Sequence, residues 1–346
     1  MNKDIQLLGL GNALIDLQYL VSDQELIDLK FEKGTMTLVD FDKQKEIMEK
    51  FSDRGQHKMS GGSAANTIIS FANLGGKAAY ESYLGNDELG EFYSNEFNEL
   101  GIKLSATKTN DDLTGTSFVL ITPDSERTMV TALGANTKHN KNDINEELIK
   151  RSEWLYIEGY KLTDPQSAEA VFHSIDIANN NNTKIALSFS DKFIVDFFRD
   201  PLDKVIKHSN LIFCNELEAK SYTGSEKTIY TFEKLKDIVP NLALTLGANG
   251  SLIHWGKVNL HIPSYSANLI DTTGAGDMYA GAFLYGIINS GNPLYAGHLA
   301  SRASASIVSQ LGARLKDDIK ILKEEIDNKE KIGELKEFFS KFSELN

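Results

Sequence analysis

Regular alternation between short apolar runs and longer segments with helical spacing, beginning at Trp154, limits the folds open to this chain more than any other feature. Each apolar run has the length of a strand and is followed by a segment of helix length. We expect strands at 154–157, 184–188, 210–214 and 242–246 and helices at 165–180, 191–207, 215–223 and 230–238. Strands and helices that alternate in this way form a parallel sheet covered on both faces. The sequence therefore predicts an α/β fold on a doubly wound, mostly parallel sheet with flanking helices.

The remainder of the chain divides into segments that fit this sheet and segments that do not. The fitting segments are strands at 5–10 and 78–84 and helices at 42–51, 61–74, 86–101 and 293–310. One or two surface helices follow in the tail from Lys316, where apolar residues up to Phe342 have mostly helical spacing. Four strand-like runs show no strand–helix alternation, at 14–21, 34–39, 114–122 and 127–133. The turn formers at 123–126 join the last two into a hairpin. We expect these runs to form a small separate sheet.

Composition restricts the partners and the compartment. The 346 residues carry 49 acidic and 36 basic side chains, a net charge of −13, which argues against a nucleic acid polymer or an anionic membrane as the main partner. Small phosphorylated ligands remain compatible with this balance. Cys214 is the single cysteine, so no internal disulfide forms, and a reducing, cytoplasmic setting is expected. The apolar run near the N-terminus is too short and polar for a membrane span and lacks a signal-peptide cleavage pattern.

The stretch from Asn268 to Met278 combines a glycine turn with an acid at the start of an apolar helical run. We expect a short strand, a turn at Gly274-Ala275-Gly276, and a helix with Asp277 in its first turn. Uncovered N–H groups at a helix start bind anions, and a neighbouring carboxylate can take a proton from an attacking hydroxyl. The pattern therefore fits phosphoryl transfer and, equally well, a helix cap after a plain tight turn. It is neither a Walker A loop nor a dinucleotide fingerprint, because no Gly-Lys-Ser/Thr follows and Tyr279 replaces the third glycine.

Two further groups of residues indicate a binding site for hydroxyl groups. Gly61 and Gly62 permit close approach by a ligand, and Asn66 lies one helical turn beyond Ser63, from where it can both donate to and accept from a sugar. The alternative is a glycine turn with Ser63 as the helix cap. Asn12 and Asp16 flank the end of the first strand, where α/β sheets bind ligands, although a turn Asn and an exposed Asp fit the sequence equally well.

Three weaker candidates concern a nucleotide. Asn215 and Glu218 have the spacing of a capping box, and Glu218 is also placed to support Mg²⁺ directly or through a water. The stretch from Thr245 through Gly247 to Gly250 is either a turn beside phosphates or a simple hairpin. Arg127 is placed either to reach a phosphate from the small sheet or to be ordinary exposed surface.

Taken together, these stretches resemble the ribokinase-like, or PfkB-type, family of carbohydrate and nucleoside kinases over roughly residues 4–315. Asp271-Thr-Thr-Gly-Ala-Gly-Asp277 is similar to the C-terminal signature of the family, and Gly61-Gly-Ser-Ala-Ala-Asn66 to the N-terminal one. Asn215-Glu-Leu-Glu218 is similar to its Asn-x-x-Glu motif, and Leu246-Gly-Ala-Asn-Gly250 to its nucleotide turn. Within the family the chain is most similar to adenosine-kinase-type members, through residues 11–16, 34–39 and 127–130.

The resemblance implies a purine-salvage kinase that transfers the γ-phosphoryl group of ATP, with Mg²⁺, to a primary hydroxyl of adenosine. It implies that Asp277 is the base and that the amides of Gly274, Ala275 and Gly276 form the anion hole. It also assigns substrate contacts to Asn12, Asp16, Gly61, Gly62, Asn66, Arg127 and Tyr160, nucleotide contacts to Asn215, Thr245, Gly247 and Gly250, and the metal to Glu218. A monovalent cation such as K⁺, and a monomer or a homodimer, both remain compatible.

The resemblance also implies a division into a core and a lid. The core comprises residues 1–11, 41–112 and 136–346, and residues 12–40 and 113–135 form a small β lid over the substrate site.

One departure from the family pattern keeps other substrates open. Adenosine kinases carry an aromatic pair after an Ile-x-Gly strand end, whereas this chain has Tyr160 followed by Lys161. Lys161 in place of the second ring weakens the expected stacking on adenine and leaves a free sugar, such as ribose or fructose, as an alternative substrate. A non-catalytic nucleoside or nucleotide sensor is the alternative from another class, and the presence of Asp277 argues against it.

Overall fold

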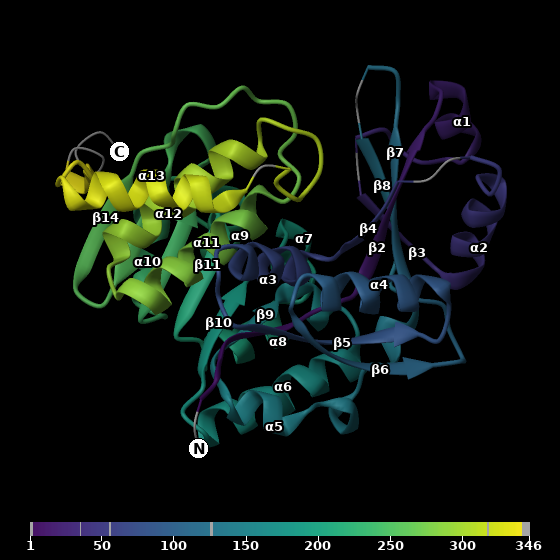
Figure 1. Ribbon diagram of the computed structural model, residues 1–346, viewed down its shortest axis with the longest axis horizontal. Helices are drawn as coiled ribbons and strands as arrows, with labels where there is room; N and C mark the ends of the chain where they lie inside the picture. The colour runs from purple at the N-terminus through teal and green to yellow at the C-terminus, as the bar shows by residue number, and fades with distance from the viewer. Residues whose placement is uncertain (1–2, 35, 55–56, 125–126, 317, 341–346) are drawn as a thin grey trace.

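The computed structural model describes residues 3–34, 36–54, 57–124, 127–316 and 318–340, which form two sheets with helices around them (Figure 1). None of the helices described is both long and apolar enough to cross a lipid bilayer.

The large sheet has nine strands in the order β14-β13-β12-β11-β10-β9-β1-β5-β6. The strands are β1 Ile5–Leu10, β5 Ala78–Gly85, β6 Lys103–Thr109, β9 Ser152–Glu158, β10 Lys184–Ser188, β11 Leu211–Asn215, β12 Asn241–Thr245, β13 Ser251–Trp255 and β14 Val258–Ile262. The seven strands β12, β11, β10, β9, β1, β5 and β6 each pair in parallel with the next. At the other edge, β13 pairs antiparallel with both β12 and β14. The prediction of a mostly parallel α/β sheet is therefore confirmed. The sequence analysis missed β6, a polar edge strand.

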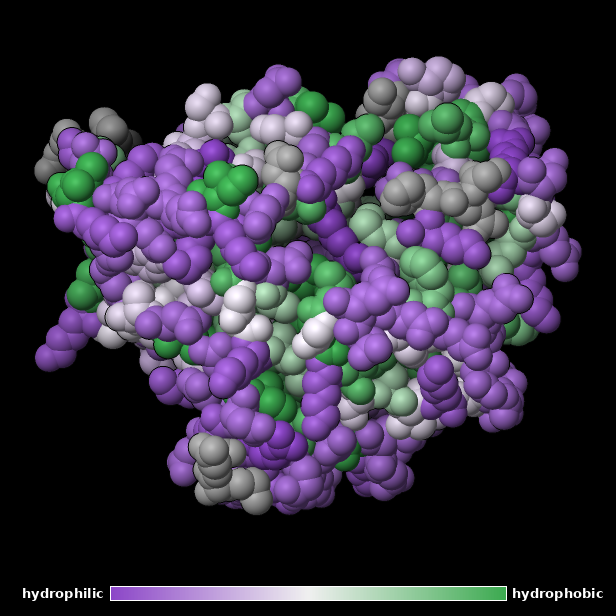
Figure 2. All heavy atoms as spheres, viewed as in Figure 1, coloured by the Kyte–Doolittle hydropathy of each residue, from purple (hydrophilic) through white to green (hydrophobic). Residues whose placement is uncertain are grey.

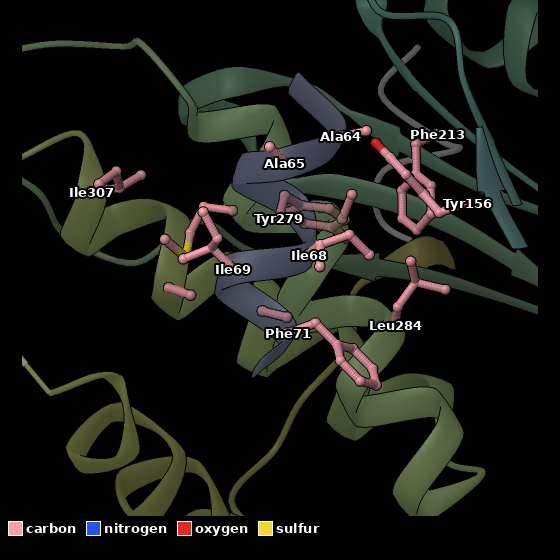
Figure 3. Packing of buried hydrophobic residues seen from close by; sticks show 14 of the residues in the cluster. Ala64, Ala65, Ile68, Ile69, Phe71, Tyr156, Phe213, Tyr279, Leu284 and Ile307 are labelled. Carbon is pink, nitrogen blue, oxygen red and sulfur yellow. The ribbon is translucent and has the colours of Figure 1, made fainter. Parts of the chain in front are cut away.

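Helices cover both faces of this sheet, because the side chains of its strands are apolar on both sides. One face packs against α3 Ser63–Asn73, α4 Glu88–Glu99, α11 Ala275–Ser290, α12 Pro293–Ile307 and α13 Ile319–Lys331. The other packs against α5 Glu146–Lys150, α6 Pro165–Asn180, α7 Lys192–Phe197, α8 Arg199–Ile206, α9 Glu216–Thr223 and α10 Thr228–Lys236. Figure 3 shows Ile68 and Ile69 of α3 packed against Tyr279 and Leu284 of α11, contacts that fix the two helix starts relative to each other.

The small sheet has five strands in the order β3-β8-β7-β2-β4. They are β2 Leu14–Leu20, β3 Met36–Val39, β4 His57–Gly61, β7 Gly115–Ile121 and β8 Arg127–Ala132, and α1 Asp23–Asp28 and α2 Phe41–Lys50 accompany them. Residues of β2 alternate, with Ile15, Leu17 and Tyr19 buried. This buried side packs against Leu26 of α1 and Ile47 of α2, so the two helices cover one face and leave the other toward the large sheet (Figure 1).

Three expectations differ from the structure. The strand β4 pairs with β2 in the small sheet, although the expected boundaries place residues 41–112 in the core. The expected helix at 191–207 is two helices that meet at Phe198. The strand expected directly before the glycine turn at 274–276 is absent. Residues 263–269 form a loop there, in which Leu269 is exposed. The tail contains α13, which agrees with the expectation of one or two helices from Lys316, and Phe342 lies outside the described residues.

Short 3₁₀ turns complete the chain: η1 Gly134–Lys138, η2 Lys141–Asp143, η3 Gly159–Leu162 and η4 Gly247–Asn249. The surface drawn in Figure 2 is mostly hydrophilic, and a hollow separates the part built on the small sheet from the part that carries the C-terminal helices.

Candidate active site

A cavity of about 450 Å³ lies between the open face of the small sheet and the carboxyl ends of the strands of the large sheet. Asn12, Glu158, Ser188 and Asn215 line it at or just beyond the ends of β1, β9, β10 and β11. Parallel strands bring their carboxyl ends to one edge, which is where open α/β sheets bind ligands. The small sheet closes the other side with apolar and hydroxyl side chains.

The glycine turn before α11 opens on this cavity. Gly274 is the residue before the helix and has a φ of 75°, a left-handed conformation that favours glycine. A Cβ there would also lie 2.7 Å from the Cβ of Ala313, whereas a Cβ on Gly276 would meet no atom within 4 Å. Within the described residues, the N–H groups of Gly276 and Asp277 have no protein acceptor. These open donors lie at the positive end of a 16-residue helix, where negative charge is favoured. Of the three amides predicted for the anion hole, that of Ala275 instead donates to the carbonyl of Thr272 at 3.2 Å.

Asp277 lies in the first turn of α11 and lines the same cavity. The Ser63 hydroxyl donates to its Oδ1 at 2.6 Å, and the Asn66 amide donates to its Oδ2 at 3.4 Å. Burial raises the pKa of Asp277 to about 6, and these two hydrogen bonds oppose that shift. The group is therefore a carboxylate at neutral pH with a pKa close to that of an effective general base.

Residues predicted to bind the acceptor substrate cluster beside this carboxylate. Asn12, Asp16, Gly62 and Asn66 all line the cavity. The amide oxygen of Asn66 has no hydrogen-bond donor in the part of the chain described here, so an acceptor is available for a substrate hydroxyl. Burial raises the pKa of Asp16 to about 7, against the attraction of Arg314. A Cβ on Gly61 would lie 2.5 Å from the Asp16 carboxylate, so this glycine makes room for Asp16 without itself lining the cavity.

One wall of the cavity is apolar and comes from the small sheet. Its members are Leu14, Met36, Leu38, Met129 and Leu133. Tyr160, in η3, also lines the cavity and is partly exposed.

The side chain of Lys161 does not point into the cavity. Its side chain is fully buried outside the cavity lining, with its Nζ 3.2 Å from the His139 Nδ1 and 3.3 Å from the Ser167 hydroxyl. The expectation that Lys161 replaces an aromatic wall of the substrate site is therefore wrong, because the side chain turns into the core.

Only some of the residues predicted to bind the nucleotide line the cavity. Asn215, Glu218 and Thr245 line it, whereas Gly247 and Gly250 lie in the turn of the β12–β13 hairpin. The capping-box interpretation of Asn215 and Glu218 is confirmed, with both reciprocal hydrogen bonds present.

Glu218 nevertheless fits a role with Mg²⁺. Burial, together with the charges of Asp191 and Asp277, raises its pKa to about 7. A metal that keeps most of its waters needs few carboxylates and would relieve this repulsion. No group of three or more Asp, Glu, His or Cys side chains at metal-binding distances exists within the described residues.

Arg127 does not line the cavity and instead joins the small sheet to the loop before α11. Its Nη1 lies 2.6 Å from Oδ2 of Asp271, the first residue of the glycine-rich stretch. Asp271 also accepts from the backbone N–H groups of Thr273 at 3.0 Å and Gly312 at 2.8 Å. Arg127 therefore links β8 to the loop that carries the anion site.

Sequence reasoning missed Glu158, which is buried at the end of β9. Its Oε1 accepts from the N–H of Asn12 at 2.7 Å and its Oε2 from the N–H of Ala64 at 2.8 Å. An acid directly after an apolar strand is the same signal that singled out Asp16, so the rule that ligands lie beyond strand ends would have found Glu158.

Comparison with known proteins agrees with this geometry. Residues 34–320 match the model of the "pfkB family carbohydrate kinase". The chain is 26% identical over 309 residues to adenosine kinase 2 of Arabidopsis thaliana, a match covering 82% of this chain and 88% of that protein.

Two solved structures share the fold over most of both chains. A probable sugar kinase from Rhizobium etli has a TM-score of 0.85 at 28% identity, covering 94% of this chain and 99% of its own. An adenosine kinase from Sinorhizobium meliloti has a TM-score of 0.84 at 27% identity, covering 93% and 99%. The fold is thus ribokinase-like, and the chain belongs to the PfkB family of carbohydrate and nucleoside kinases, which are phosphotransferases acting on hydroxyl groups.

Proposed function

We propose that this kinase transfers the γ-phosphoryl group of ATP to the primary hydroxyl of adenosine, giving AMP. The observation that carries the proposal is the position of Asp277, a carboxylate beside open helix-end amides in a cavity with an apolar wall. Similarity to adenosine kinases over most of the chain supports it.

Each part of the site has a task in the transfer. Asp277 accepts the proton of the attacking hydroxyl, while Ser63 and Asn66 orient its carboxylate. The N–H groups of Gly276 and Asp277 hold negative charge that develops on the transferred group. Mg²⁺, when bound, neutralises phosphate charge, and Glu218 would hold it directly or through a water.

The shape of the acceptor end favours a nucleoside over a free sugar. Asp16, Gly62 and Asn66 offer partners for two neighbouring ribose hydroxyls. The wall of Leu14, Met36, Leu38, Met129 and Leu133 has nothing to bury if the substrate ends at the sugar. A purine opposite Tyr160 would cover this apolar surface. Because Lys161 lies outside the cavity, it places no charge beside the base.

A substrate panel tests the proposal. The wild-type chain is assayed with ATP and Mg²⁺ against adenosine, inosine, ribose and fructose, with and without K⁺, and kcat/KM is compared. We expect adenosine to exceed ribose by roughly 10²-fold or more, because burying a purine face contributes about 3 kcal/mol at 25 cal/mol per Å². Ribose or fructose as the best acceptor would replace the proposal by a sugar kinase, the second candidate, which the similarity to a probable sugar kinase supports. Saturable adenosine binding with no product from any acceptor would indicate a sensor.

A further inference from the structure

The open face of the small sheet carries one row of polar side chains that crosses neighbouring strands (Figure 1). Asp16 of β2 lies directly opposite Ser117 of β7. Ser117 in turn lies opposite Thr131 of β8, which lies opposite Leu38 of β3. All four side chains line the cavity. Since neighbouring strands are about 4.8 Å apart, the two hydroxyl groups follow the Asp16 carboxylate in steps of about 5 Å. The row therefore leads from the proposed ribose contact into the apolar wall.

Apolar side chains flank this polar row on both sides. Leu14 of β2 and Leu133, directly after β8, lie one row to one side. Met36 and Met129, which lie opposite each other, form the next row on the other side. These four side chains also line the cavity. The two apolar rows are four residues apart along the strands, or about 13 Å, which leaves room for a flat ring that stands between them with its edge toward the hydroxyl groups.

The hydroxyl groups of Ser117 and Thr131 are only loosely bound to each other. Thr131 donates to Ser117 at 3.4 Å, which is longer than an ordinary bond between two hydroxyl groups. Both residues are largely buried, with 6% and 8% of their surface exposed. Among the described residues, no protein group accepts the hydrogen of the Ser117 hydroxyl. A buried hydroxyl group without a full set of partners costs free energy, so polar groups of a ligand are favoured beside this pair.

We propose that Thr131 and Ser117 select the base of the acceptor, by contacting the substituent at C6 of a purine and the ring nitrogen beside it, and that this kinase accepts purine ribonucleosides with either an amino or an oxo group at C6. The inference rests on the proposed function, because it takes the ribose to lie at Asp16 and the primary hydroxyl at Asp277. It goes beyond that function by naming the residues that read the base and by adding inosine to the substrates.

The order of side chains along the row matches the order of groups in a purine nucleoside. With the ribose hydroxyls at Asp16, the base extends along the row toward Thr131. The substituent at C6 lies at the end of the base remote from the sugar, and Thr131 is the polar member of the row remote from Asp16. Beyond it the row ends in the apolar side chain of Leu38. The flanking leucines and methionines would cover the two faces of the ring, to which a thioether sulfur is attracted.

A pair of hydroxyl groups does not distinguish adenosine from inosine, because each hydroxyl both donates and accepts hydrogen bonds. In adenosine the C6 substituent donates and the neighbouring ring nitrogen accepts, whereas in inosine these two roles are exchanged. Hydroxyl groups at Thr131 and Ser117 can rotate to match either pattern. A site with a fixed donor or acceptor would reject one of the two nucleosides. In the described strands of the small sheet, Asp16 is the only charged or amide side chain that lines the cavity, and it lies at the ribose end.

The first test compares three acceptors with the wild-type chain, ATP and Mg²⁺. They are adenosine, inosine and purine riboside, which has no substituent at C6. We expect kcat/KM for inosine to lie within about tenfold of the value for adenosine. Purine riboside should be about fivefold poorer than adenosine, the usual effect of one hydrogen bond. A larger gap between inosine and adenosine, or purine riboside as good an acceptor as adenosine, would overturn the inference.

The second test removes one hydroxyl group and keeps the branched shape of the side chain. Thr131→Val should lower kcat/KM for adenosine and for inosine by about fivefold each and leave purine riboside within about twofold. Thr128→Val is the matched control in the same strand, because Thr128 does not line the cavity and its hydroxyl accepts from the N–H of Gly34 at 3.0 Å. It should leave the ratios among the three acceptors unchanged. Equal losses for all three acceptors in Thr131→Val would mean a role in packing and would overturn the inference.

The inference and the proposed function fail in different ways. Phosphorylation of ribose or fructose with no product from any nucleoside would overturn both, whereas efficient use of adenosine with inosine more than tenfold poorer would overturn the inference alone. Isothermal titration calorimetry without ATP adds a readout that needs no turnover. The wild-type chain should bind adenosine about fivefold more tightly than purine riboside, and Thr131→Ser, which keeps a hydroxyl group, should retain this preference. Equal affinities in the wild-type chain would overturn the inference even if Thr131→Val does not fold.

Discussion

Helices α3 and α11 begin alike and yet present different chemistry to the cavity. Each is preceded by a glycine with positive φ, 101° at Gly62 and 75° at Gly274, and neither has a side-chain cap. At α3 the protein supplies its own anion, because Glu158 accepts from the N–H of Ala64. At α11 the N–H groups of Gly276 and Asp277 meet no acceptor in the described chain.

This difference assigns the two helix starts different tasks. A helix start that already holds a carboxylate has little attraction left for a phosphate, so α3 serves to position side chains. A helix start with free donors keeps that attraction for a ligand, so α11 is where the transferred group is expected. The hydrogen bond from Ser63 to Asp277 ties the positioning helix to the reacting one.

The largest effect is expected from Asp277→Asn, which removes the base but keeps the shape of the α11 start. We expect kcat to fall by roughly 10² to 10⁴, the usual contribution of a general base. Stability at pH 8 should not fall. The pKa of Asp277 is raised from an ordinary value of 3.8 to about 6 in the folded chain, so this group stabilises the fold fully at a pH below 3.8. The contribution is lost as the pH rises through 6, and at pH 8 its removal costs no stability.

Steady-state kinetics and thermal unfolding of the same samples check both parts. Retained activity in Asp277→Asn would remove Asp277 from the mechanism, and with it the catalytic role that distinguishes the α11 start from the α3 start.

A methyl group at Gly276 should separate activity from stability at the same helix start. Gly276→Ala clashes with no protein atom and lies inside a helix, where alanine is favoured over glycine by about 1 kcal/mol. We therefore expect a slightly higher Tm, with kcat reduced on the order of 10²-fold, since the methyl group enters the space before the anion-binding amides.

The control for this variant is Gly291→Ala, at the other end of α11, where nothing lies within 4 Å of the added carbon. Because Gly291 has a φ of 68°, this substitution should cost about 1 kcal/mol of stability and leave kcat unchanged. Wild-type kcat in Gly276→Ala would mean that the phosphoryl group does not approach this turn.

Some parts of the fold and of the site can be predicted from the sequence, and others cannot. Six strands of the large sheet, β1, β5, β9, β10, β11 and β12, were predicted because both of their faces are buried, so each is one apolar run bounded by a turn. The edge strand β6 was missed because five of its seven residues are only partly buried and polar ones dominate it. The strand β4 was missed for a related reason: it reads as part of a polar segment and is recognisable only by its pairing with β2.

At the site, the glycine turn and Asp277 were predictable because local sequence alone makes the helix start and places the acid in its first turn. The contact between Ser63 and Asp277 spans 214 positions and depends on how α3 packs against α11. Lys161 was misplaced for the same reason. Sequence shows which residue follows Tyr160, but only packing shows that its side chain turns toward His139.

Gly62→Ala should mainly affect stability, in contrast to Gly276→Ala. An added Cβ at Gly62 would lie 2.1 Å from the carbonyl oxygen of Asn12, and the φ of 101° is unfavourable for any other residue. We expect a loss of roughly 2–3 kcal/mol, the sum of backbone strain and displacement of the Asn12 turn. Chemical denaturation measures it.

Gly224→Ala is the matched control for Gly62, because its φ of 62° carries the strain alone, with no atom within 4 Å of the added carbon. A loss at Gly62 no larger than at Gly224 would show that the α3 start has room to move away from the carbonyl of Asn12.

The smallest effect is expected from Ser63→Ala, which removes the link between the two helix starts. The base must be deprotonated, so kcat/KM should rise as the pH rises through the pKa of Asp277, about 6. The Ser63 hydroxyl donates to the carboxylate and lowers that pKa, so its removal should move the acid limb of the profile to higher pH by roughly half a unit. Ser70→Ala is the control, since its hydroxyl also joins α3 to α11, by donating to the sulfur of Met278 at 3.1 Å. A shift in both variants would make the effect one of helix packing, whereas a shift in Ser63→Ala alone would show that α3 tunes the base that α11 presents.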